Sequence, residues 1–320
     1  MRSPLPVRDG VNATRLRLPR EGEWATVMDY VLHRFGHVDP DGIVGRFRGG
    51  EVVGVGGVAL DEATPLGAHD FLWYYRNLPA EEPIPFTETI LHRDGDLLVV
   101  DKPHFLPTTP GGRFVQESAL VRLRNRLGIP DLIPMHRLDR ATAGVILFST
   151  NPDTRGAYQV LFERRQIRKE YECVSALPPG AGTGPHGPGL SGHEFPLVYR
   201  NRMAKVKGTL LSTVEDGEPN AESRVDLIRT GRSRGTHAGA DVGLFRLRPH
   251  TGKTHQLRVH MAALGLGILN DPFYPVLLDK APDDHARPLQ LVARSIAFTD
   301  PLKGREVQFR SAQQLLERPE

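Results

Sequence analysis

The first 80 or so residues carry the hydrophobic pattern of a small unit of their own. Apolar residues at helical spacing predict a helix near the start of this unit: Trp24, Val27, Met28, Val31, Leu32 and Phe35. Gly36 follows them as the expected C-terminal cap of this helix. Residues 49–60 (GGEVVGVGGVAL) predict a hairpin interrupted by glycines. A proline-rich, acidic segment over residues 78–85 is typical of a linker, so we expect a small N-terminal α+β domain over residues 1–85.

From residue 86 onward, short apolar runs are mixed with segments of helical spacing. The predicted strands cover residues 97–100, 145–148, 169–177 and 242–248. The predicted helices cover Leu120–Leu127, a segment around Ala157 and Leu161, and residues 255–264 with Thr254 as cap and Leu257, Met261 and Leu264 in the core. Since strands and helices lack regular βαβ spacing, we expect an α+β fold.

Glycine and proline are concentrated at two places in this second region. Residues 178–192 hold ten of them in fifteen positions, which predicts a flexible surface insertion. Residues 231–240 predict a second flexible connection. We expect the larger domain to span residues 86–312, followed by a C-terminal tail over residues 313–320.

The charge of the chain is segregated along the sequence. Residues 112–169 hold eleven basic and five acidic residues, a net charge of +6, and residues 241–260 hold four basic residues and one acidic residue, a net charge of +3. The summed net charge of the two segments therefore exceeds the net charge of the whole chain, which is +3. The remaining regions are therefore net acidic, and such segregation is typical of a polyanion-binding face. Of the 41 basic residues only seven are lysine, which fits either codon bias or phosphate recognition by guanidinium groups.

Several classes of protein are excluded by composition and motifs. The single cysteine, Cys173, excludes an intramolecular disulfide and a multi-cysteine zinc or iron–sulfur site. No phosphate-binding glycine motif is present. His250, His255 and His260 lack the spacing of helix-borne metal ligands, so we expect no metal and no metal-dependent nuclease. With no apolar signal segment or membrane span, we expect a cytoplasmic monomer without a membrane partner.

Two dense segments are candidates for chemistry. In residues 134–150 (PMHRLDRATAGVILFST), Asp139 lies between two arginines on a turn that enters a buried strand. A carboxylate so placed stays ionised and serves as a nucleophile or base, although a purely structural ion pair fits the same spacing. In residues 246–275, Arg258 lies in the first turns of the predicted helix. The basic residues there have two interpretations, an anion-binding site and a solvated basic face, and both stay open.

Four ordered blocks resemble a known family. Residues 136–144 (HRLDRATAG) resemble the HRLDxxTSG signature of RluA-type RNA pseudouridine synthases. Residues 90–103 resemble the opening block that ends in Asn/Asp-Lys-Pro, and residues 168–171 resemble the block that ends in Lys-x-Tyr. Residues 249–260 resemble the TGRxHQxRxH block, which is followed by Asp271 and Tyr274 in the usual Asp-x-x-Tyr.

The resemblance implies a mixed, mainly antiparallel sheet with flanking helices, and isomerisation of specific uridines to pseudouridine in structured RNA without metal or organic cofactor. It implies that Asp139 acts at the ribose C1′, that Tyr171 stacks on the base and takes part in proton transfer, and that Arg258 pairs with Asp139. The substrate-binding residues that we expect are His136, Arg137, Arg140, Thr142, Lys102, Lys253, His255 and Gln256. Large-subunit ribosomal RNA is the expected partner, with transfer RNA as the alternative.

Three positions depart from the family pattern: Ala143 stands where Ser is usual, Lys253 where Arg is usual, and Asn270 where Gly is usual. These departures motivate a second hypothesis, a non-catalytic RNA-binding protein on the same scaffold. The N-terminal region occupies the place where many relatives carry a small ribosomal-type RNA-binding domain, and its helix-then-hairpin pattern is similar.

Overall fold

The computed structural model describes residues 2–178, 190, 192–205, 208, 211–278 and 282–320, and the predicted insertion at 178–192 falls mainly outside them. The chain forms two compact units. Unit 1 comprises the residues up to Glu82 together with 112–116 and 121–130, and unit 2 comprises the rest. The grouping of 121–130 with unit 1 differs from the predicted boundary at residue 85. Its reason lies in helix α3 (Ala119–Leu127), where the Arg124 guanidinium donates to the Gly10 carbonyl at 2.9 Å.

Unit 1 packs two helices on a small sheet. Helix α1 (Val27–Phe35) begins with a capping box in which Thr26 and Asp29 bond each other's backbone N–H groups, and helix α2 (Pro40–Arg48) follows. Strands β1 (Thr14–Arg17) and β2 (Phe71–Tyr74) pair antiparallel. The core between these elements holds Leu18, Val27, Tyr30, Val31, Ile43, Phe47, Val52, Leu60 and Leu72. The structure therefore contains the predicted helix.

The predicted glycine-interrupted hairpin over residues 49–60 is present in a short form. An antiparallel bridge joins Val53 and Ala59 around a 3₁₀ turn, η1 (Val55–Gly57), the Gly54 N–H donates to the Val58 carbonyl at 2.7 Å, and the Leu60 N–H donates to the Val52 carbonyl at 2.8 Å. Gly56 and Gly57 both have positive φ, 78° and 80°, so glycine suits the turn. Helix α2 and strand β2 were not predicted.

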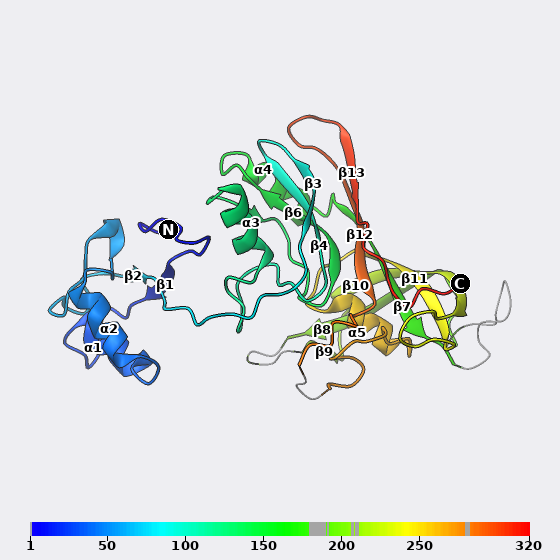
Figure 1. Ribbon diagram of the computed structural model, residues 1–320, viewed down its shortest axis with the longest axis horizontal. Helices are drawn as coiled ribbons and strands as arrows, with labels where there is room; N and C mark the ends of the chain where they lie inside the picture. Colours follow the sequence, from blue (N-terminus) through cyan, green and yellow to red (C-terminus); the bar gives the residue numbers. More distant parts are fainter. Residues whose placement is uncertain (1, 179–189, 191, 206–207, 209–210, 279–281) are drawn as a thin grey trace. The chain divides into compact units, whose positions relative to one another are not determined.

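Unit 2 is built on one large sheet (Figure 1). Its strands run in the order β3-β4-β6-β12-β7-β11-β10-β8-β9, with β5 paired to β6 and β13 paired to β12. The β6–β12 pair is parallel and the other described pairs are antiparallel, which confirms the predicted mixed, mainly antiparallel sheet of an α+β fold. The strands are β3 (Thr89–Arg93), β4 (Leu97–Lys102), β5 (Ile133–Pro134), β6 (Ala143–Ser149), β7 (Arg168–Ala176), β8 (Leu197–Ala204), β9 (Thr213–Glu215), β10 (Ala221–Arg232), β11 (Asp241–Pro249), β12 (Leu291–Thr299) and β13 (Glu306–Arg310).

Strand β12 separates β6 from β7 and contacts both at one residue. Ala293 is in register with Gly144 of β6 on one side and with Tyr171 of β7 on the other. Gly144 has φ 117°, and a Cβ placed on it would lie 2.3 Å from the Ala293 carbonyl oxygen. Because no side chain fits at that distance, glycine is required for the close approach of β6 and β12.

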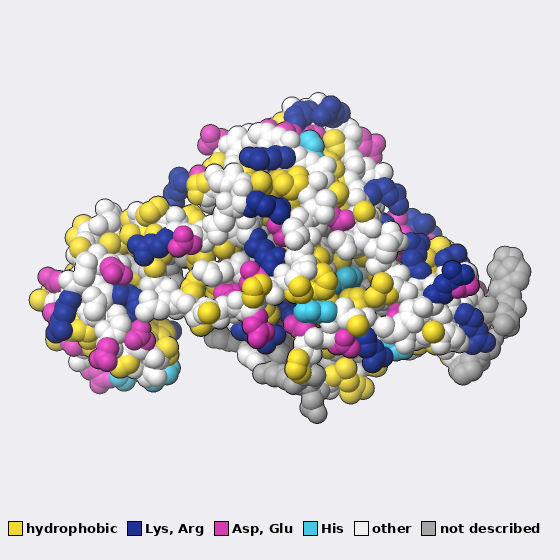
Figure 2. All heavy atoms as spheres, viewed as in Figure 1, with side chains coloured by type: hydrophobic (Ala, Val, Ile, Leu, Met, Phe, Trp, Pro, Cys, Tyr) yellow, Lys and Arg dark blue, Asp and Glu magenta, His cyan; other side chains and the backbone are white. Residues whose placement is uncertain are grey.

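Charged side chains of both signs cover the outside of the sheet. Figure 2 shows Lys and Arg interspersed with Asp and Glu on the face in view, with a group of basic side chains around β7 and β11. Ion pairs connect neighbouring strands: Arg248 reaches Asp226 at 2.8 Å and Glu170 at 3.2 Å. Exposed pairs of this kind add little to stability, but they fix the directions of the arginines.

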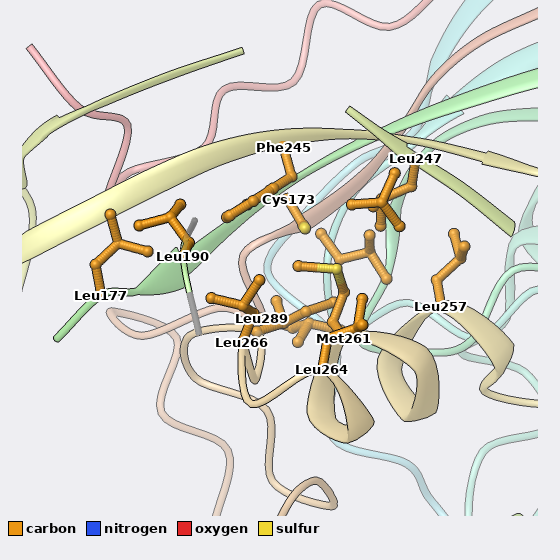
Figure 3. Packing of buried hydrophobic residues seen from close by; sticks show 13 residues of the cluster. Cys173, Leu177, Leu190, Phe245, Leu247, Leu257, Met261, Leu264, Leu266 and Leu289 are labelled. Atoms are coloured by element: carbon orange, nitrogen blue, oxygen red, sulfur yellow. The ribbon is translucent and has the colours of Figure 1, made fainter. Parts of the chain in front are cut away.

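Two helices cover the sheet of unit 2. Helix α4 (Arg155–Glu163) buries Tyr158 and Leu161 against β4, β6 and β12. Helix α5 (Gln256–Ala263) directs Leu257 and Met261 toward β7 and β11, with Leu264 just beyond its last turn (Figure 3).

The predicted core positions of helix α5 are present, but its predicted cap is wrong. The N-terminal cap is His255, with φ 56° and no side-chain cap bond, and not Thr254. The left-handed residue turns the chain sharply between the loop before it and the helix.

The last residues of the chain do not form a separate tail. Leu315 is buried among residues of β6, β7, β11 and β12, and Glu317 is fully buried. The Glu317 carboxylate accepts hydrogen bonds from Ser233, Thr236 and His237, at 2.5 to 3.1 Å. The predicted loop at 231–240 is therefore the β10–β11 connection, and it closes around this carboxylate.

Candidate active site

The largest described pocket, about 1420 Å³, lies in unit 2. It is lined by the turn before β6, by β7, by the loop 249–255 and by helix α5, with parts of β10, β12 and β13 at its edges. All three predicted catalytic residues line it: Asp139, Tyr171 and Arg258. Six of the eight predicted binding residues line it as well: His136, Arg137, Thr142, Lys253, His255 and Gln256.

Asp139 lies in this pocket beside the guanidinium of Arg258 and the imidazole of His255. Its side chain is 31% exposed, and its Oδ2 lies 3.5 Å from Nη1 of Arg258 and 3.8 Å from Nε2 of His255. The predicted approach of Arg258 to Asp139 is therefore present. Asp139 is also the first residue of a β-turn, since its carbonyl accepts the Thr142 N–H at 3.1 Å.

Arg258 has a stronger partner than the one predicted. Its guanidinium is 2% exposed and bonds Asp271 through two atoms, Nε to Oδ2 at 2.7 Å and Nη2 to Oδ1 at 2.5 Å. Burial opposes its charge, but the hydrogen bonds and charge of Asp271, with the charge of Asp139, raise the pKa of Arg258. One buried cation is thus fixed by one carboxylate and presented to another.

The pair Asp271 and Tyr274 forms a part of the site whose roles the sequence left unassigned. The Tyr274 hydroxyl lies 3.1 Å from Nδ1 of His255 and accepts the Ser212 N–H at 2.8 Å. The Arg258 guanidinium lies 4.9 Å from the ring centre of Phe273 and 5.4 Å from that of Tyr274. The signal for these residues was the Asp-x-x-Tyr spacing after the helix.

Tyr171 forms a flat wall on the β7 side of the pocket. It is half-buried, and its neighbours in the sheet are Ala293 of β12 and Leu247 of β11. Burial raises the pKa of its hydroxyl, and the charge of Asp139 raises it further. The side chain therefore stays protonated near neutral pH, with a ring able to stack on a base.

His136 and Thr142 shape the turn that carries Asp139. Nε2 of His136 accepts the Leu147 N–H at 3.2 Å, and its ring packs 5.2 Å from Phe162. Burial lowers the pKa of His136 to about 3, so the imidazole is neutral. Thr142 is buried. Both residues line the pocket, and their described hydrogen bonds are to the protein itself.

Gln256 fixes the loop that carries Lys253. Its Oε1 accepts from the Thr251 hydroxyl at 2.7 Å and from the Lys253 N–H at 3.0 Å. Its Nε2 donates to the Glu222 carbonyl and the Ser223 hydroxyl, both at 2.9 Å. These four hydrogen bonds use the full donor and acceptor capacity of the amide. The described role of Gln256 is therefore to hold this loop, and its predicted contact with substrate stays a prediction. Lys253 and Arg137 are exposed at the pocket.

Lys102 and Arg140 are the two predicted binding residues that do not line the pocket. Lys102 is 0% exposed, and its Nζ donates to the carbonyls of Pro103, Leu106 and Arg140 at 2.9, 2.8 and 3.3 Å. Burial lowers its pKa to about 7, against the charge of Asp139. Arg140 pairs with Asp283, Nη1 to Oδ1 at 3.0 Å. Both side chains have protein partners and do not line the pocket, and their predicted contact with RNA stays a prediction.

Two of the departures from the family pattern have a structural account. Asn270 has φ 60°, a left-handed conformation that suits glycine and that asparagine tolerates. Its side chain lies 2.9 Å from Nε2 of His237 and donates to the Pro288 carbonyl at 3.2 Å. Ala143 is fully buried among apolar residues that include Val174 and Val292, where a methyl group fits.

Two absences hold for the described residues. They contain no group of three or more His, Cys, Asp or Glu side chains that could hold a metal ion. They also contain no helix that is long and apolar enough to cross a membrane.

Comparison with known proteins agrees with this geometry. The family described as RNA pseudouridylate synthase matches residues 96–263. The chain is 30% identical over 236 residues to the dual-specificity RNA pseudouridine synthase RluA of Salmonella typhi, covering 72% of this chain and 94% of that protein. It is 28% identical over 254 residues to an uncharacterized RNA pseudouridine synthase, slr1592, of Synechocystis sp., covering 78% and 79%.

A solved structure shares the fold. Human RNA pseudouridylate synthase domain containing 1 superposes with a TM-score of 0.52 at 20% identity, covering 73% of this chain and 86% of that one. The family match spans more than half of the chain and includes Asp139, Tyr171 and Arg258. The chain therefore belongs to the RNA pseudouridylate synthase family, as an isomerase of the RluA type.

Proposed function

We propose that the pocket around Asp139 isomerises specific uridines in structured RNA, with large-subunit ribosomal RNA as the substrate. The observation that carries the proposal is the Asp139 carboxylate at the pocket wall, 3.5 Å from a buried guanidinium that Asp271 holds in place. An ionised carboxylate in this setting is equipped to act on an electrophilic carbon.

The reaction needs no net gain or loss of atoms. The bond from N1 of uracil to C1′ of the ribose breaks while Asp139 attacks or assists at C1′. The base turns within the pocket, and C5 bonds C1′ while any bond between Asp139 and C1′ breaks and returns its electron pair to the carboxylate. The proton of C5 is lost as N1 gains one. Tyr171 supplies the flat wall along which the detached base turns, and its protonated hydroxyl is available for the proton transfer.

Access to the base requires the nucleotide to leave its stack. A pocket of about 1420 Å³ exceeds the space of one nucleotide and accommodates its neighbours. Arg165, Arg168 and Arg248 line it together with the exposed Lys253. This supports binding of an extruded uridine with its flanking phosphates.

Transfer RNA is the second candidate substrate. The RluA relatives bear the name dual-specificity, which favours testing more than one class of RNA. In a host that lacks the gene, pseudouridines are mapped in ribosomal and transfer RNA before and after complementation. We expect wild type to restore a site in large-subunit RNA, and restoration in transfer RNA alone would favour the second candidate.

The matched variant in this experiment is Asp139→Asn, which preserves shape and removes the charge. We expect it to restore no pseudouridine while binding the same RNA with unchanged affinity. Equal restoration by Asp139→Asn would contradict the role of Asp139. A loss of modification with intact affinity would also exclude the non-catalytic RNA-binding hypothesis.

We further propose that unit 1 binds RNA through a pocket of about 620 Å³. Residues 1–82 contain nine basic and twelve acidic residues. This pocket nevertheless gathers Arg17, Arg20 and Arg34 with Trp24, Tyr30 and Phe71, and its one acidic residue, Asp70, pairs with Arg20 at 2.9 Å. Arginine beside aromatic rings suits a phosphate and a stacked base. The Arg17→Ala/Arg34→Ala variant should weaken RNA binding severalfold. Arg48→Ala, outside this pocket, is the control, and equal binding by both variants would contradict the proposal.

A further inference from the structure

The β-turn that begins at Asp139, with the residue before it, accepts hydrogen bonds from three side chains of residues 102–108: Lys102, His104 and Thr108. Arg140 and Ala141 are the two central residues of this turn, which the Asp139 carbonyl and the Thr142 N–H close at 3.1 Å. The Arg140 carbonyl accepts from Lys102 at 3.3 Å. The orientation of this peptide group is therefore set by a buried ammonium outside the pocket.

Thr108 holds the residue that precedes the turn. Its hydroxyl donates to the Leu138 carbonyl at 2.9 Å and accepts the Leu138 N–H at 3.2 Å. Both hydrogen bonds are buried. Leu138 cannot rotate about its backbone without breaking them, so the chain enters Asp139 in one direction.

His104 holds the second central peptide of the turn. Its Nδ1 lies 2.6 Å from the Ala141 carbonyl oxygen, so this nitrogen carries the proton and donates it. Its Nε2 is buried and has no hydrogen-bond partner among the described residues. Burial and the charge of Lys102 lower the pKa of His104 to about 4, against the hydrogen bond to Ala141, which raises it, so the ring is neutral near pH 7.

Phe105 keeps His104 in place. It has φ 65°, a conformation that a bulky side chain rarely adopts, and it persists where surrounding contacts determine it. Its ring stacks on Phe86 with centres 5.9 Å apart and meets His285 at 4.9 Å. The backbone at 104–105 is thus held by contacts with Phe86 and His285, and the guanidinium of Arg140 in the turn also lies over the Phe105 ring, 5.8 Å from its centre.

We propose that His104 is a positioning residue of the isomerase: by holding the Ala141 carbonyl, its Nδ1–H fixes the turn and with it the direction of the Asp139 carboxylate toward the substrate. The inference rests on the proposed role of Asp139. It differs from a role in folding, since the hydrogen bond orients one peptide and not the sheet. It also differs from substrate binding, since His104 does not line the pocket.

The test compares His104→Leu, which fills the space without a donor, with His104→Asn, whose amide nitrogen stands near the position of Nδ1. The single-turnover rate and the affinity are measured on an RNA that wild type modifies. We expect His104→Leu to lose about tenfold in rate, the effect of one hydrogen bond, with unchanged affinity. We expect His104→Asn to recover most of that rate.

Matched controls separate positioning from stability. His92→Leu, in β3 outside the pocket, should keep the wild-type rate, and thermal unfolding of all variants is recorded. Equal rates for His104→Leu and His104→Asn, a loss confined to affinity, or a rate loss that follows the loss of thermal stability across both variants would each overturn the proposal.

A readout without activity separates this inference from the proposed function. In wild-type protein labelled with ¹⁵N-histidine, His104, assigned with the His104→Asn variant, should be the Nδ1–H tautomer and stay neutral down to about pH 5. The Nε2–H tautomer, or titration near pH 6.5, would overturn the inference whatever the enzyme does. If wild type modifies no RNA, the proposed function fails, and this spectrum still decides whether His104 holds the turn.

Discussion

At the scale of single residues, the site depends on one guanidinium, that of Arg258, which contacts two carboxylates, those of Asp271 and Asp139. Arg258 is buried and bonds Asp271 twice, while its remaining nitrogen faces Asp139 at 3.5 Å. A freely rotating arginine would lose much of its entropy on pairing with Asp139 alone. The Asp271 contacts remove that freedom before substrate arrives, so Asp139 meets a fixed charge.

The substitution Asp271→Asn tests whether Asp271 holds Arg258 in place beside Asp139. We expect a loss of about tenfold or more in single-turnover rate, because Arg258 loses the carboxylate that orients it. We also expect a loss of about 3 kcal/mol in the free energy of unfolding, because a buried charge loses a partner. RNA affinity should change little.

Asp241→Asn is the matched control, since Asp241 also pairs with an arginine, Arg232, at 3.2 Å, but outside the pocket. Its rate should stay near that of wild type. An equal rate loss in both variants would show that the Asp271 effect is not specific to the pocket.

Asn270 provides a second test at this scale. Asn270→Gly should cost at most about 1 kcal/mol of unfolding free energy, because glycine accepts φ 60° and loses only side-chain hydrogen bonds. Asn270→Val should cost about 2 kcal/mol or more, because a β-branched residue is strained there. Urea unfolding of the two variants decides, and equal costs would contradict the backbone explanation.

At the scale of elements, β12 sets the spacing of the site. Asp139 precedes β6, Tyr171 lies on β7, and β12 lies between these two strands. Since Ala293 is in register with both Gly144 and Tyr171, the close approach at Gly144 also determines how far Tyr171 stands from the Asp139 turn. The glycine in the motif HRLDRATAG is therefore a spacing residue.

Gly144→Ala should lower the free energy of unfolding by about 3 kcal/mol, since its Cβ would lie 2.3 Å from the Ala293 carbonyl oxygen at a φ of 117°. Gly156→Ala in α4 is the control, because its Cβ would meet nothing within 4 Å. That variant should be neutral or more stable by about 0.5 kcal/mol. Denaturant unfolding measures both, and similar values would contradict the role of Gly144.

The sequence predicted those elements whose pattern is local. Leu257, Met261 and Leu264 indicated α5, and the apolar run at 145–148 indicated β6, because burial of these residues is visible in their spacing. Strand β2 was missed although FLWY is an apolar run like that of β6, because it pairs with β1 (Thr14–Arg17), which lies far away in the sequence.

The site was predictable to the extent that its motifs are contiguous. Asp139 and Arg258 could be found from motifs in the sequence. The motifs do not show in which direction a side chain points. Lys102 and Gln256 carry the chemistry of binding residues, yet protein groups take up their hydrogen bonds, among them the Arg140 and Glu222 carbonyls from other segments. Such partners are supplied by tertiary packing and leave no mark in nearby sequence.

At the scale of the whole molecule, buried neutral histidines make unit 2 sensitive to acid. Burial lowers the pKa of His136 to about 3 and those of His104 and His260 to about 4. In the unfolded chain these groups titrate near 6.5. Between about pH 4 and 6.5 the unfolded chain thus binds more protons, so their contribution to stability is complete above 6.5 and is lost as the pH falls.

Lowering the pH from 7.5 to 5.5 should cost about 1 kcal/mol of unfolding free energy for each of these histidines. His260 is buried on α5, with Nε2 3.0 Å from Asn201. In His260→Asn the difference between the two pH values should shrink by about 1 kcal/mol. Urea unfolding at both pH values measures it, and an unchanged difference would falsify the assignment for His260.

The position of β12 in the chain has a consequence for the timing of synthesis. β3, β4 and β6 form one part of the sheet, β7 to β11 form the other, and β12 (Leu291–Thr299) is the strand that joins them (Figure 1). While a ribosome is still translating the residues before β12, the nascent chain holds two separate sheet edges, with Asp139 beside one and Tyr171 on the other. We therefore expect the active site to form only after this late strand has emerged and inserted between them.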